Sequence, residues 1–159
     1  PYRGVLYAGL MIKDEKPRLV EYNVRFGDPE CQVLMMRLGA QALDLMLACA
    51  KGHLSNITIN WAKDHALTVV MATKGYPGAY DKGSIVRNLH NLSTSSKAMC
   101  FHAGTNQSDD LIMANGGRVL NVTARADTLL EARNQAYKMV VEVDWPDGFF
   151  RGDIGWRAL

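Results

Sequence analysis

The chain has 159 residues, of which 48% are hydrophobic and 21% charged, with a net charge of +2. This length allows one compact domain or two small ones. The charge is too small to indicate nucleic acid or an anionic membrane surface as a partner. No apolar run reaches the roughly 18 residues of a membrane-spanning helix, and residues 1–12 lack the pattern of a signal peptide. We therefore expect a cytoplasmic protein that binds neither nucleic acid nor membrane.

The cysteines and the first residue give two further expectations. Cys31, Cys49 and Cys100 are odd in number and widely spaced, which favours a reducing compartment over a disulfide framework. They lack the spacing of metal ligands, so we interpret them as packing residues. The chain begins at Pro1, without Met, and leads directly into a strand-like run. We expect it to be a piece of a longer protein.

The first predicted element is an antiparallel hairpin. Residues 4–12 and 18–24 are rich in strand formers, and the polar segment 13–17, which contains a proline, lies between them. Because side chains alternate between faces along a strand, Glu21 and Asn23 should share one face.

The second predicted element is a helix over residues 31–51, where apolar residues recur at helical spacing. The sequence Asp28-Pro29-Glu30 is typical of a helix start, and Lys51-Gly52 is typical of a helix end. The polar, aperiodic residues 53–65 that follow indicate a connecting segment.

The remaining residues predict a small unit of strands with one good helix. Thr128 and Glu131 have the spacing of a capping box at the start of an amphipathic helix over 128–143. The fold class is therefore α+β, with a hairpin and helix in residues 1–57 and a small mixed α/β domain in residues 58–159. The other expected elements are strands at 67–73, 85–89, 97–102 and 118–124, a shaped loop at 74–84, and a tail at 144–159 that packs across the domain.

The pair Glu21 and Asn23 is a candidate metal site. Magnesium prefers oxygen ligands and is usually held by one or two protein groups together with substrate phosphates. A carboxylate and a carboxamide two residues apart on one strand offer two such oxygens. The simpler interpretation is a half-solvated strand face that carries two polar side chains.

The residues after this strand suggest further binding chemistry. Arg25 offers a planar set of donors for phosphoryl or carboxylate oxygens, and Gly27 permits unusual backbone angles or a close approach of substrate. Asp28 and Glu30 could hold an amine. The alternative is that Asp28 caps the helix and Arg25 is its salt-bridge partner. Taken together, the residues of this region describe a site for ATP and an amino acid.

Residues 25–32 (RFGDPECQ), preceded by 20–23 (VEYN), closely resemble the signature of glycinamide ribonucleotide synthetase, also called phosphoribosylamine–glycine ligase. This family belongs to the ATP-grasp enzymes of purine biosynthesis. The resemblance is to the C-terminal portion of the family's polypeptide: the end of the ATP-grasp domain and the C-terminal domain. Further segments that resemble the family in the same order are 2–12, 70–83, 101–105, 115–124 and 151–159.

The resemblance implies an ATP-dependent ligation of glycine to 5-phosphoribosylamine through a glycyl phosphate intermediate, giving glycinamide ribonucleotide, ADP and phosphate. It implies that Glu21 and Asn23 hold Mg²⁺ or Mn²⁺ on the ATP phosphates. On physical grounds we assign Arg25 to the transferring phosphoryl group or the acyl phosphate. Asp28 and Glu30 are candidates for the glycine ammonium or the attacking amine. Arg25 therefore counts as both a catalytic and an ATP-binding candidate.

Several features leave alternatives open. The strand at residues 6–12 lacks the additional metal-binding acid that many ATP-grasp enzymes carry. The N-terminal part of the enzyme is expected as a partner, and the chain alone should be inactive. Another ATP-grasp carboxylate–amine ligase and a non-catalytic remnant remain as alternatives. The loop at 75–83 could line a site or orient domains, and His102 is expected to be a core or hydrogen-bonded histidine.

Overall fold

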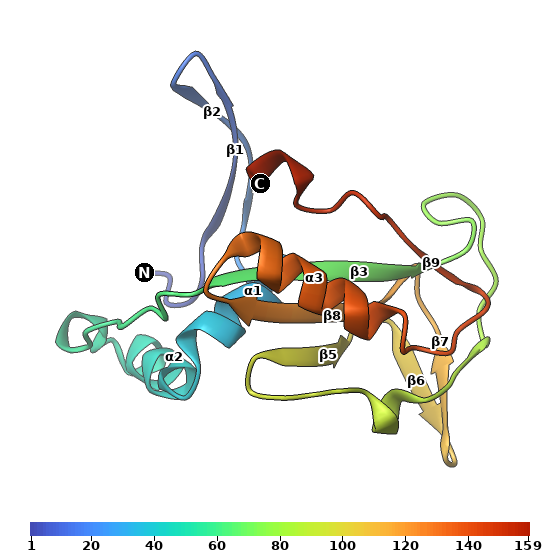
Figure 1. Cartoon of the computed structure of the whole chain (residues 1–159). Helices are drawn as coiled ribbons and strands as arrows, with labels where there is room; N and C mark the ends of the chain where they lie inside the picture. The colour runs from blue at the N-terminus through green and yellow to red at the C-terminus, as the bar shows by residue number, and fades with distance from the viewer. The chain divides into compact units, whose positions relative to one another are not determined.

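The computed structural model describes residues 1–159, and the contacts within the chain divide it into two compact units (Figure 1). The first unit is Pro1–Ala62 and the second is Lys63–Leu159.

The first unit begins with the predicted hairpin. Strand β1 (Tyr7–Lys13) pairs antiparallel with β2 (Lys16–Asn23), with a register irregularity after Gly9. The two residues of the connecting turn, Asp14 and Glu15, both have positive φ, of 50° and 59°. Positive φ at both central residues gives the turn a backbone twist that matches the right-handed twist of the two strands. The predicted hairpin is confirmed, and β2 ends before Arg25.

The prediction of one helix over residues 31–51 is wrong. The structure has α1 (Glu30–Leu38) and α2 (Gln41–Lys51), with a bend of 106° between them. Gly39 has a φ of 58°, and its backbone N–H donates to the carbonyl of Met35, which ends α1. Positive φ costs little for glycine, so the chain turns at this point. Neither helix alone is long and apolar enough to cross a membrane. Only the two helices taken together, with the bend between them, have that length and composition.

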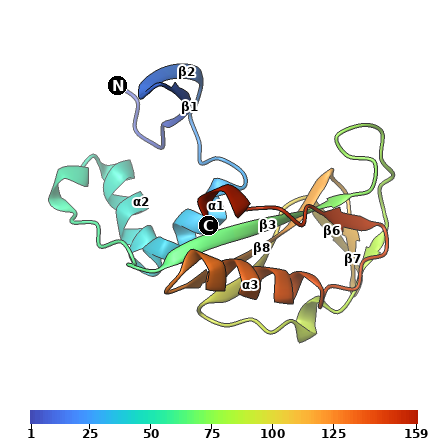
Figure 2. The same ribbon diagram turned by 45° about the horizontal axis from the view of Figure 1, so that its top comes forward.

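The second unit is built on a four-stranded antiparallel sheet. Its strand order is β5-β8-β3-β9. Helix α3 packs against β3 and β8, as Figure 1 and Figure 2 both show. The elements are β3 (His65–Thr73), β5 (Ala98–His102), β8 (Arg118–Ala126), α3 (Leu129–Val140) and β9 (Gly148–Phe150). The side chains of the fully buried core include Val69, Leu120, Val122, Ala136 and Met139.

A smaller sheet completes this unit. Its strands are β4 (Ile85–Val86), β7 (Leu111–Ala114) and β6 (Thr105–Ser108), in that order. The expected strand at 85–89 is much shorter, because Asn88 has a φ of 65° and a 3-10 turn over Leu89–Asn91 follows. Two more 3-10 turns, at Leu54–Asn56 and Trp156–Ala158, lie in the first and second unit respectively. Strands β6, β7 and β9 were not predicted.

The predicted capping box at the start of α3 is confirmed. The hydroxyl oxygen of Thr128 accepts from the backbone N–H of Glu131 at 3.2 Å, and the Glu131 carboxylate accepts from the backbone N–H of Thr128 at 3.2 Å. These two bonds satisfy donors that the first turn of a helix leaves free. Helix α3 ends at Val140, before the predicted 143.

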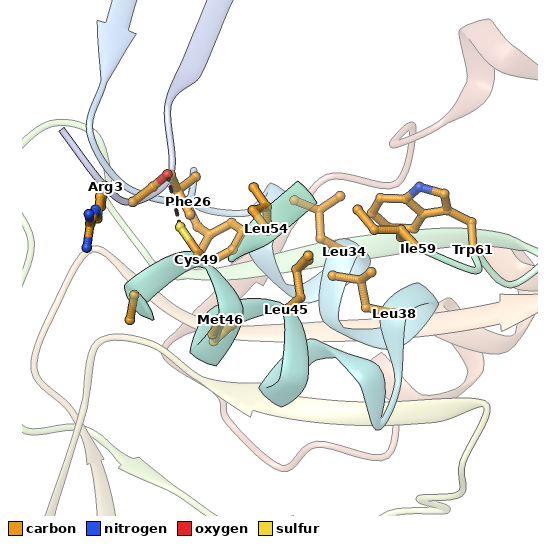
Figure 3. A pocket seen from close by; sticks show the side chains of 13 residues that line it. Arg3, Phe26, Leu34, Leu38, Leu45, Met46, Cys49, Leu54, Ile59 and Trp61 are labelled. Carbon is orange, nitrogen blue, oxygen red and sulfur yellow. Dashed lines mark hydrogen bonds between the residues drawn. The ribbon is translucent and has the colours of Figure 1, made fainter. Parts of the chain in front are cut away.

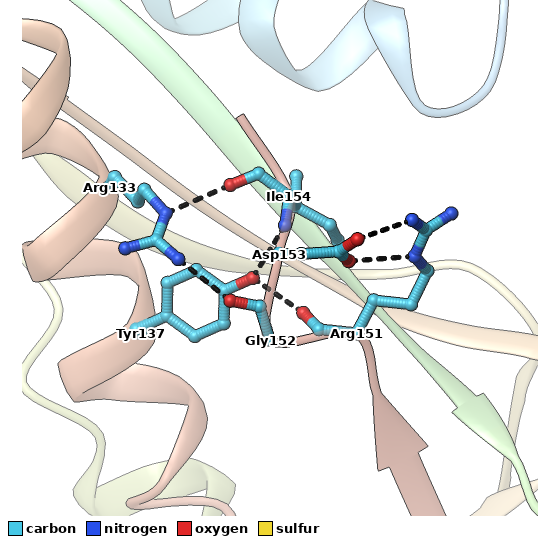
Figure 4. A network of polar contacts seen from close by, with 6 residues as sticks. All are labelled: Arg133, Tyr137, Arg151, Gly152, Asp153 and Ile154. Carbon is cyan, nitrogen blue, oxygen red and sulfur yellow. Dashed lines mark hydrogen bonds and ion pairs between the residues drawn. The ribbon is translucent and has the colours of Figure 1, made fainter. Parts of the chain in front are cut away.

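The C-terminal tail packs against α3, as predicted (Figure 4). Arg133 donates through Nε to the carbonyl of Ile154 at 3.0 Å and through Nη2 to that of Gly152 at 2.7 Å. The Tyr137 hydroxyl accepts from the Ile154 N–H at 3.1 Å and donates to the Arg151 carbonyl. The Arg133 guanidinium also lies 4.7 Å from the centre of the Tyr137 ring. Two helix side chains therefore hold the backbone of residues 151–154.

Candidate functional site

The two candidate metal ligands lie together on one face of the hairpin. The Asn23 side-chain amide donates to a carboxylate oxygen of Glu21 at 3.1 Å. This contact places both side chains on the same face of β2, as the alternation predicted. Glu21 is exposed and Asn23 is half-buried, so both can reach a ligand from solvent.

The strand opposite carries no further acid. Gly9 faces Glu21 in the hairpin register, and Tyr7 faces Asn23. A Cβ atom at Gly9 would lie 3.2 Å from Cγ of Glu21, so the glycine leaves room for this carboxylate chain. No group of three or more His, Cys, Asp or Glu side chains gathers anywhere in the chain. The pair fits a cation that takes most of its ligands from phosphates, and does not fit a cation held by protein alone.

Glu30 is bound to the hairpin by a residue that the sequence analysis missed. The Tyr7 hydroxyl donates to Oε1 of Glu30 at 3.1 Å. This hydrogen bond to a carboxylate, together with its negative charge, raises the pKa of Tyr7. The contact joins β1 to the first residue of α1. It links residues 23 positions apart, so no local sequence pattern could have indicated it.

Gly27 has a use different from the expected ones. It is buried, and a Cβ atom there would lie 2.1 Å from Oε2 of Glu30. The close approach is therefore made by the Glu30 carboxylate within the chain, and the φ of Gly27 is not positive. Oε2 is itself buried and has no hydrogen-bond partner.

Arg25 and Asp28 are placed differently from the other candidates. The Arg25 side chain is exposed, and its Nη1 donates to the carbonyl of Phe26 at 2.8 Å. The structure therefore does not bring Arg25 onto Glu21 or Asn23. Pro29 occupies the N-cap position of α1, so Asp28 lies one residue before the position that the capping alternative would give it. The Asp28 charge adds to burial in raising the pKa of Cys31.

An apolar hollow of about 520 Å³ lies within the first unit (Figure 3). Arg3 is its one charged residue, and the Cys49 thiol donates weakly to the carbonyl of Gly4 at 3.8 Å. Such a lining offers few groups that could orient a nucleotide, and it suits contact with other apolar chain. The side chains around it include Phe26, Leu34, Leu38, Leu45, Met46, Leu54, Ile59 and Trp61.

In the second unit the shaped loop is held firmly at both ends. Thr73 donates through its N–H to the carbonyl of Gly117 and through its hydroxyl to that of Gly116, both at 2.8 Å. A Cβ atom at Gly117 would lie 2.1 Å from the Tyr76 ring. At the other end, Gly83 donates to the carbonyl of Ala114 at 2.7 Å. These bonds give the loop a defined shape, and they leave open whether it lines a site.

His102 is not a core residue. Its ring is exposed, and Nδ1 is hydrogen-bonded to the Thr105 hydroxyl at 3.0 Å. The expected hydrogen bond is therefore present, while the expected burial is not. Cys100, two residues earlier, is half-buried, and burial raises the pKa of its thiol to about 11. A thiol with so high a pKa is protonated at neutral pH, as expected for a packing residue.

Two family models match the chain. The model of the phosphoribosylglycinamide synthetase C domain matches residues 66–157, and that of the ATP-grasp (A) domain of the same synthetase matches residues 1–31. The first match alone covers more than half of the chain. The chain therefore belongs to the phosphoribosylglycinamide synthetase family, as the resemblance of its motifs implied.

Individual relatives agree with this membership. A phosphoribosylamine–glycine ligase of Brucella melitensis is 52% identical over 159 residues, which are 100% of this chain and 37% of that protein. A chloroplastic phosphoribosylamine–glycine ligase of Arabidopsis thaliana is 54% identical over 98% of this chain and 30% of that protein. The chain thus spans about a third of the length of the relatives it matches.

Solved structures confirm the fold. The crystal structure of a phosphoribosylamine–glycine ligase from Thermotoga maritima matches with a TM-score of 0.81 and 33% identity, over 94% of this chain and 36% of that one. A pyruvate carboxylase from Rhizobium etli matches with a TM-score of 0.62 at 20% identity, over 94% of this chain and 15% of that one, which is a likeness of fold alone. The predicted α+β fold class is confirmed.

Proposed function

We propose that the complete polypeptide carrying this chain joins glycine to 5-phosphoribosylamine at the expense of ATP. The products are glycinamide ribonucleotide, ADP and phosphate, formed through a glycyl phosphate. The single observation that carries this proposal is the Glu21–Asn23 pair on one hairpin face, in a chain about half identical to proteins named as this ligase. The chain alone should be inactive, because it spans about a third of its relatives' length.

We assign the two units to different domains of the ligase. Residues 1–57 form the C-terminal part of an ATP-grasp domain, and residues 58–159 form the C-terminal domain of the ligase. The family matches over 1–31 and 66–157 support this division, as does the separation into units between Ala62 and Lys63. The exact boundary at 57/58 stays a prediction.

Glu21 and Asn23 would hold Mg²⁺ or Mn²⁺ through one carboxylate and one carboxamide oxygen. When bound, the ion would offset the negative charge of the ATP phosphates. The hairpin contributes rigidity: both side chains come from one paired strand, and Gly9 opposite leaves space beside Glu21. A hydrogen bond already holds the two side chains beside each other, so they lose little conformational entropy when the ion binds.

The other candidate residues take the roles that their chemistry allows. Arg25 is exposed and bonded only to a neighbouring carbonyl, so its guanidinium can swing to a phosphoryl or acyl phosphate oxygen. Glu30 is the better placed acid for an ammonium or amine, because the Tyr7 hydroxyl holds its Oε1 and leaves a second lone pair there. Asp28 remains the second candidate for that role.

The rest of the enzyme is the proposed partner of the first unit. Many large apolar side chains of the hairpin are exposed in this chain, and the hollow of the first unit is apolar. Exposed large apolar side chains that gather on one element are typical of an interface with another part of a protein. The exposed hairpin residues include Leu10, Met11, Ile12, Leu19 and Val20.

A cytoplasmic location also stays a proposal. All three cysteines are free, which agrees with a reducing compartment. The relative from Arabidopsis thaliana is named as chloroplastic, so relatives of this chain occur in more than one compartment.

The test is glycine-dependent release of ADP by the complete polypeptide with phosphoribosylamine and Mg·ATP. The proposal expects release only when all three substrates are present. Release that depends on another carboxylic acid would favour a different ATP-grasp ligase. No Mg·ATP binding by the complete polypeptide would favour a non-catalytic remnant.

A further inference from the structure

We propose that Tyr7 is a positioning residue of the ligase site, whose hydroxyl holds the Glu30 carboxylate in place for the amino group of a substrate. This inference rests on the proposed function, because it gives Glu30 its task. Tyr7 touches no reacting atom in this account, and it acts through Glu30.

The contact that carries the inference joins two separate elements. Tyr7 is the first residue of β1, Glu30 is the first residue of α1, and the hydroxyl lies 3.1 Å from Oε1. A hydrogen bond to an ionised acceptor is stronger than one between neutral groups, and at 3.1 Å this one lies at the long end of the range for hydroxyl donors. Tyr7 is half-buried, and this is the one side-chain hydrogen bond that joins it to α1.

Glu30 has no other side-chain hydrogen bond. Its Oε2 is buried against Gly27 and receives no hydrogen bond. Because Oε2 is closed off by this packing, the acceptor capacity left for a substrate ammonium or amine lies on Oε1. The Tyr7 hydroxyl thus occupies one lone pair on Oε1 and leaves the other for the substrate.

The same tyrosine connects this acid to the candidate metal ligands. Tyr7 is paired with Asn23 across the hairpin, and Asn23 is hydrogen-bonded to Glu21. The strand pair that presents the ATP-binding face therefore also anchors the acid on α1. Such an anchor fixes the distance between the two groups, which a ligation between a phosphorylated acid and an amine requires.

The test compares Tyr7→Phe with Tyr22→Phe in the complete polypeptide. Tyr22 is a matched control because it lies on the same hairpin, is 61% exposed, and projects from the face opposite Glu21 and Asn23. We expect Tyr7→Phe to lower kcat/KM for glycine or for phosphoribosylamine by about tenfold or more, because it removes one hydrogen bond to a carboxylate. The KM for Mg·ATP should stay within about twofold, and Tyr22→Phe should leave all constants within about twofold.

A double-mutant cycle with Glu30→Gln separates positioning from general support. If Tyr7 acts through Glu30, adding Tyr7→Phe to Glu30→Gln causes no further loss. The inference would be overturned if the losses from the two substitutions multiplied, or if the Tyr7→Phe enzyme were as active as wild type. It would also be overturned if Tyr7→Phe weakened Mg·ATP binding together with activity. A wild-type polypeptide without glycine-dependent ligation refutes the proposed function instead, whatever the state of Tyr7.

Discussion

Gly27 lies directly against the Glu30 carboxylate, with a would-be Cβ only 2.1 Å from Oε2. No side chain, even a methyl group, fits between them while Glu30 keeps its bond to Tyr7. The glycine in the RFGDPE segment is therefore explained by packing within the chain. Position 27 requires glycine because the Glu30 carboxylate occupies the space of a side chain there.

Gly27→Ala should displace the Glu30 carboxylate and break its bond to Tyr7. We expect a loss of about 1–3 kcal/mol in the free energy of unfolding, from overpacking and a lost hydrogen bond. Urea unfolding followed by circular dichroism measures it. Gly152→Ala is the control, because a Cβ there meets nothing within 4 Å and the φ of Gly152 is not positive. Equal stability of the two variants would show that Glu30 moves aside at no cost.

Tyr137→Phe should loosen the C-terminal tail. The hydroxyl accepts from the N–H of Ile154 and donates to the carbonyl of Arg151, and phenylalanine removes both bonds. Because each such bond contributes about 1 kcal/mol, we expect the amide of Ile154 to exchange roughly 10-fold to 30-fold faster. Hydrogen exchange by NMR measures this rate. The control is Tyr80→Phe, whose ring packs on Tyr76 in the shaped loop. Unchanged exchange at Ile154 would mean that Arg133 alone holds the tail.

Acid should release the pair formed by Arg151 and Asp153. Two hydrogen bonds of 2.9 and 2.7 Å from the guanidinium lower the pKa of the Asp153 carboxyl below its usual 3.8. A lowered folded-state pKa contributes stability that is present above the unfolded-state value and is lost as the pH falls through the folded-state value. Both side chains are exposed, so the effect on global stability is small.

The measurement for this pair is an NMR titration of the Asp153 carboxyl. Arg151→Gln should raise its pKa toward the usual value, since the main cause of the shift is removed. An unchanged titration in Arg151→Gln would show that Arg157 or the backbone amide causes the shift, both of which also lower this pKa.

Local patterns in the sequence predicted the elements whose causes are local. The hairpin follows from two strand-like runs around a polar turn, and the start of α3 follows from Thr128 and Glu131. The break at Gly39 was missed because the apolar period continues across it, and a glycine within a helical pattern is often tolerated. The hairpin β6–β7 was missed because its outer strand, Thr105–Ser108, has no apolar residue.

The candidate site was predictable only in part. Alternation along β2 was enough to place Glu21 beside Asn23. The partnership of Tyr7 with Glu30 depends on how the hairpin meets α1, which no spacing within either element encodes. Arg25 was grouped with the metal ligands because it is near them in sequence, yet it follows the end of β2 and is bonded to Phe26.

The most direct test of this account is the rate of glycine-dependent ADP release by the complete polypeptide, for wild type and for Glu21→Gln. We predict release that needs glycine, phosphoribosylamine and Mg·ATP together. Glu21→Gln should lower it at least about 100-fold at fixed Mg²⁺, since the carboxylate supplies the charge that holds the ion. Circular dichroism should show an unchanged fold, because Glu21 is exposed. Glycine-dependent release that is equal in wild type and Glu21→Gln would contradict the assignment of the metal site, and no release from wild type would contradict the proposed activity.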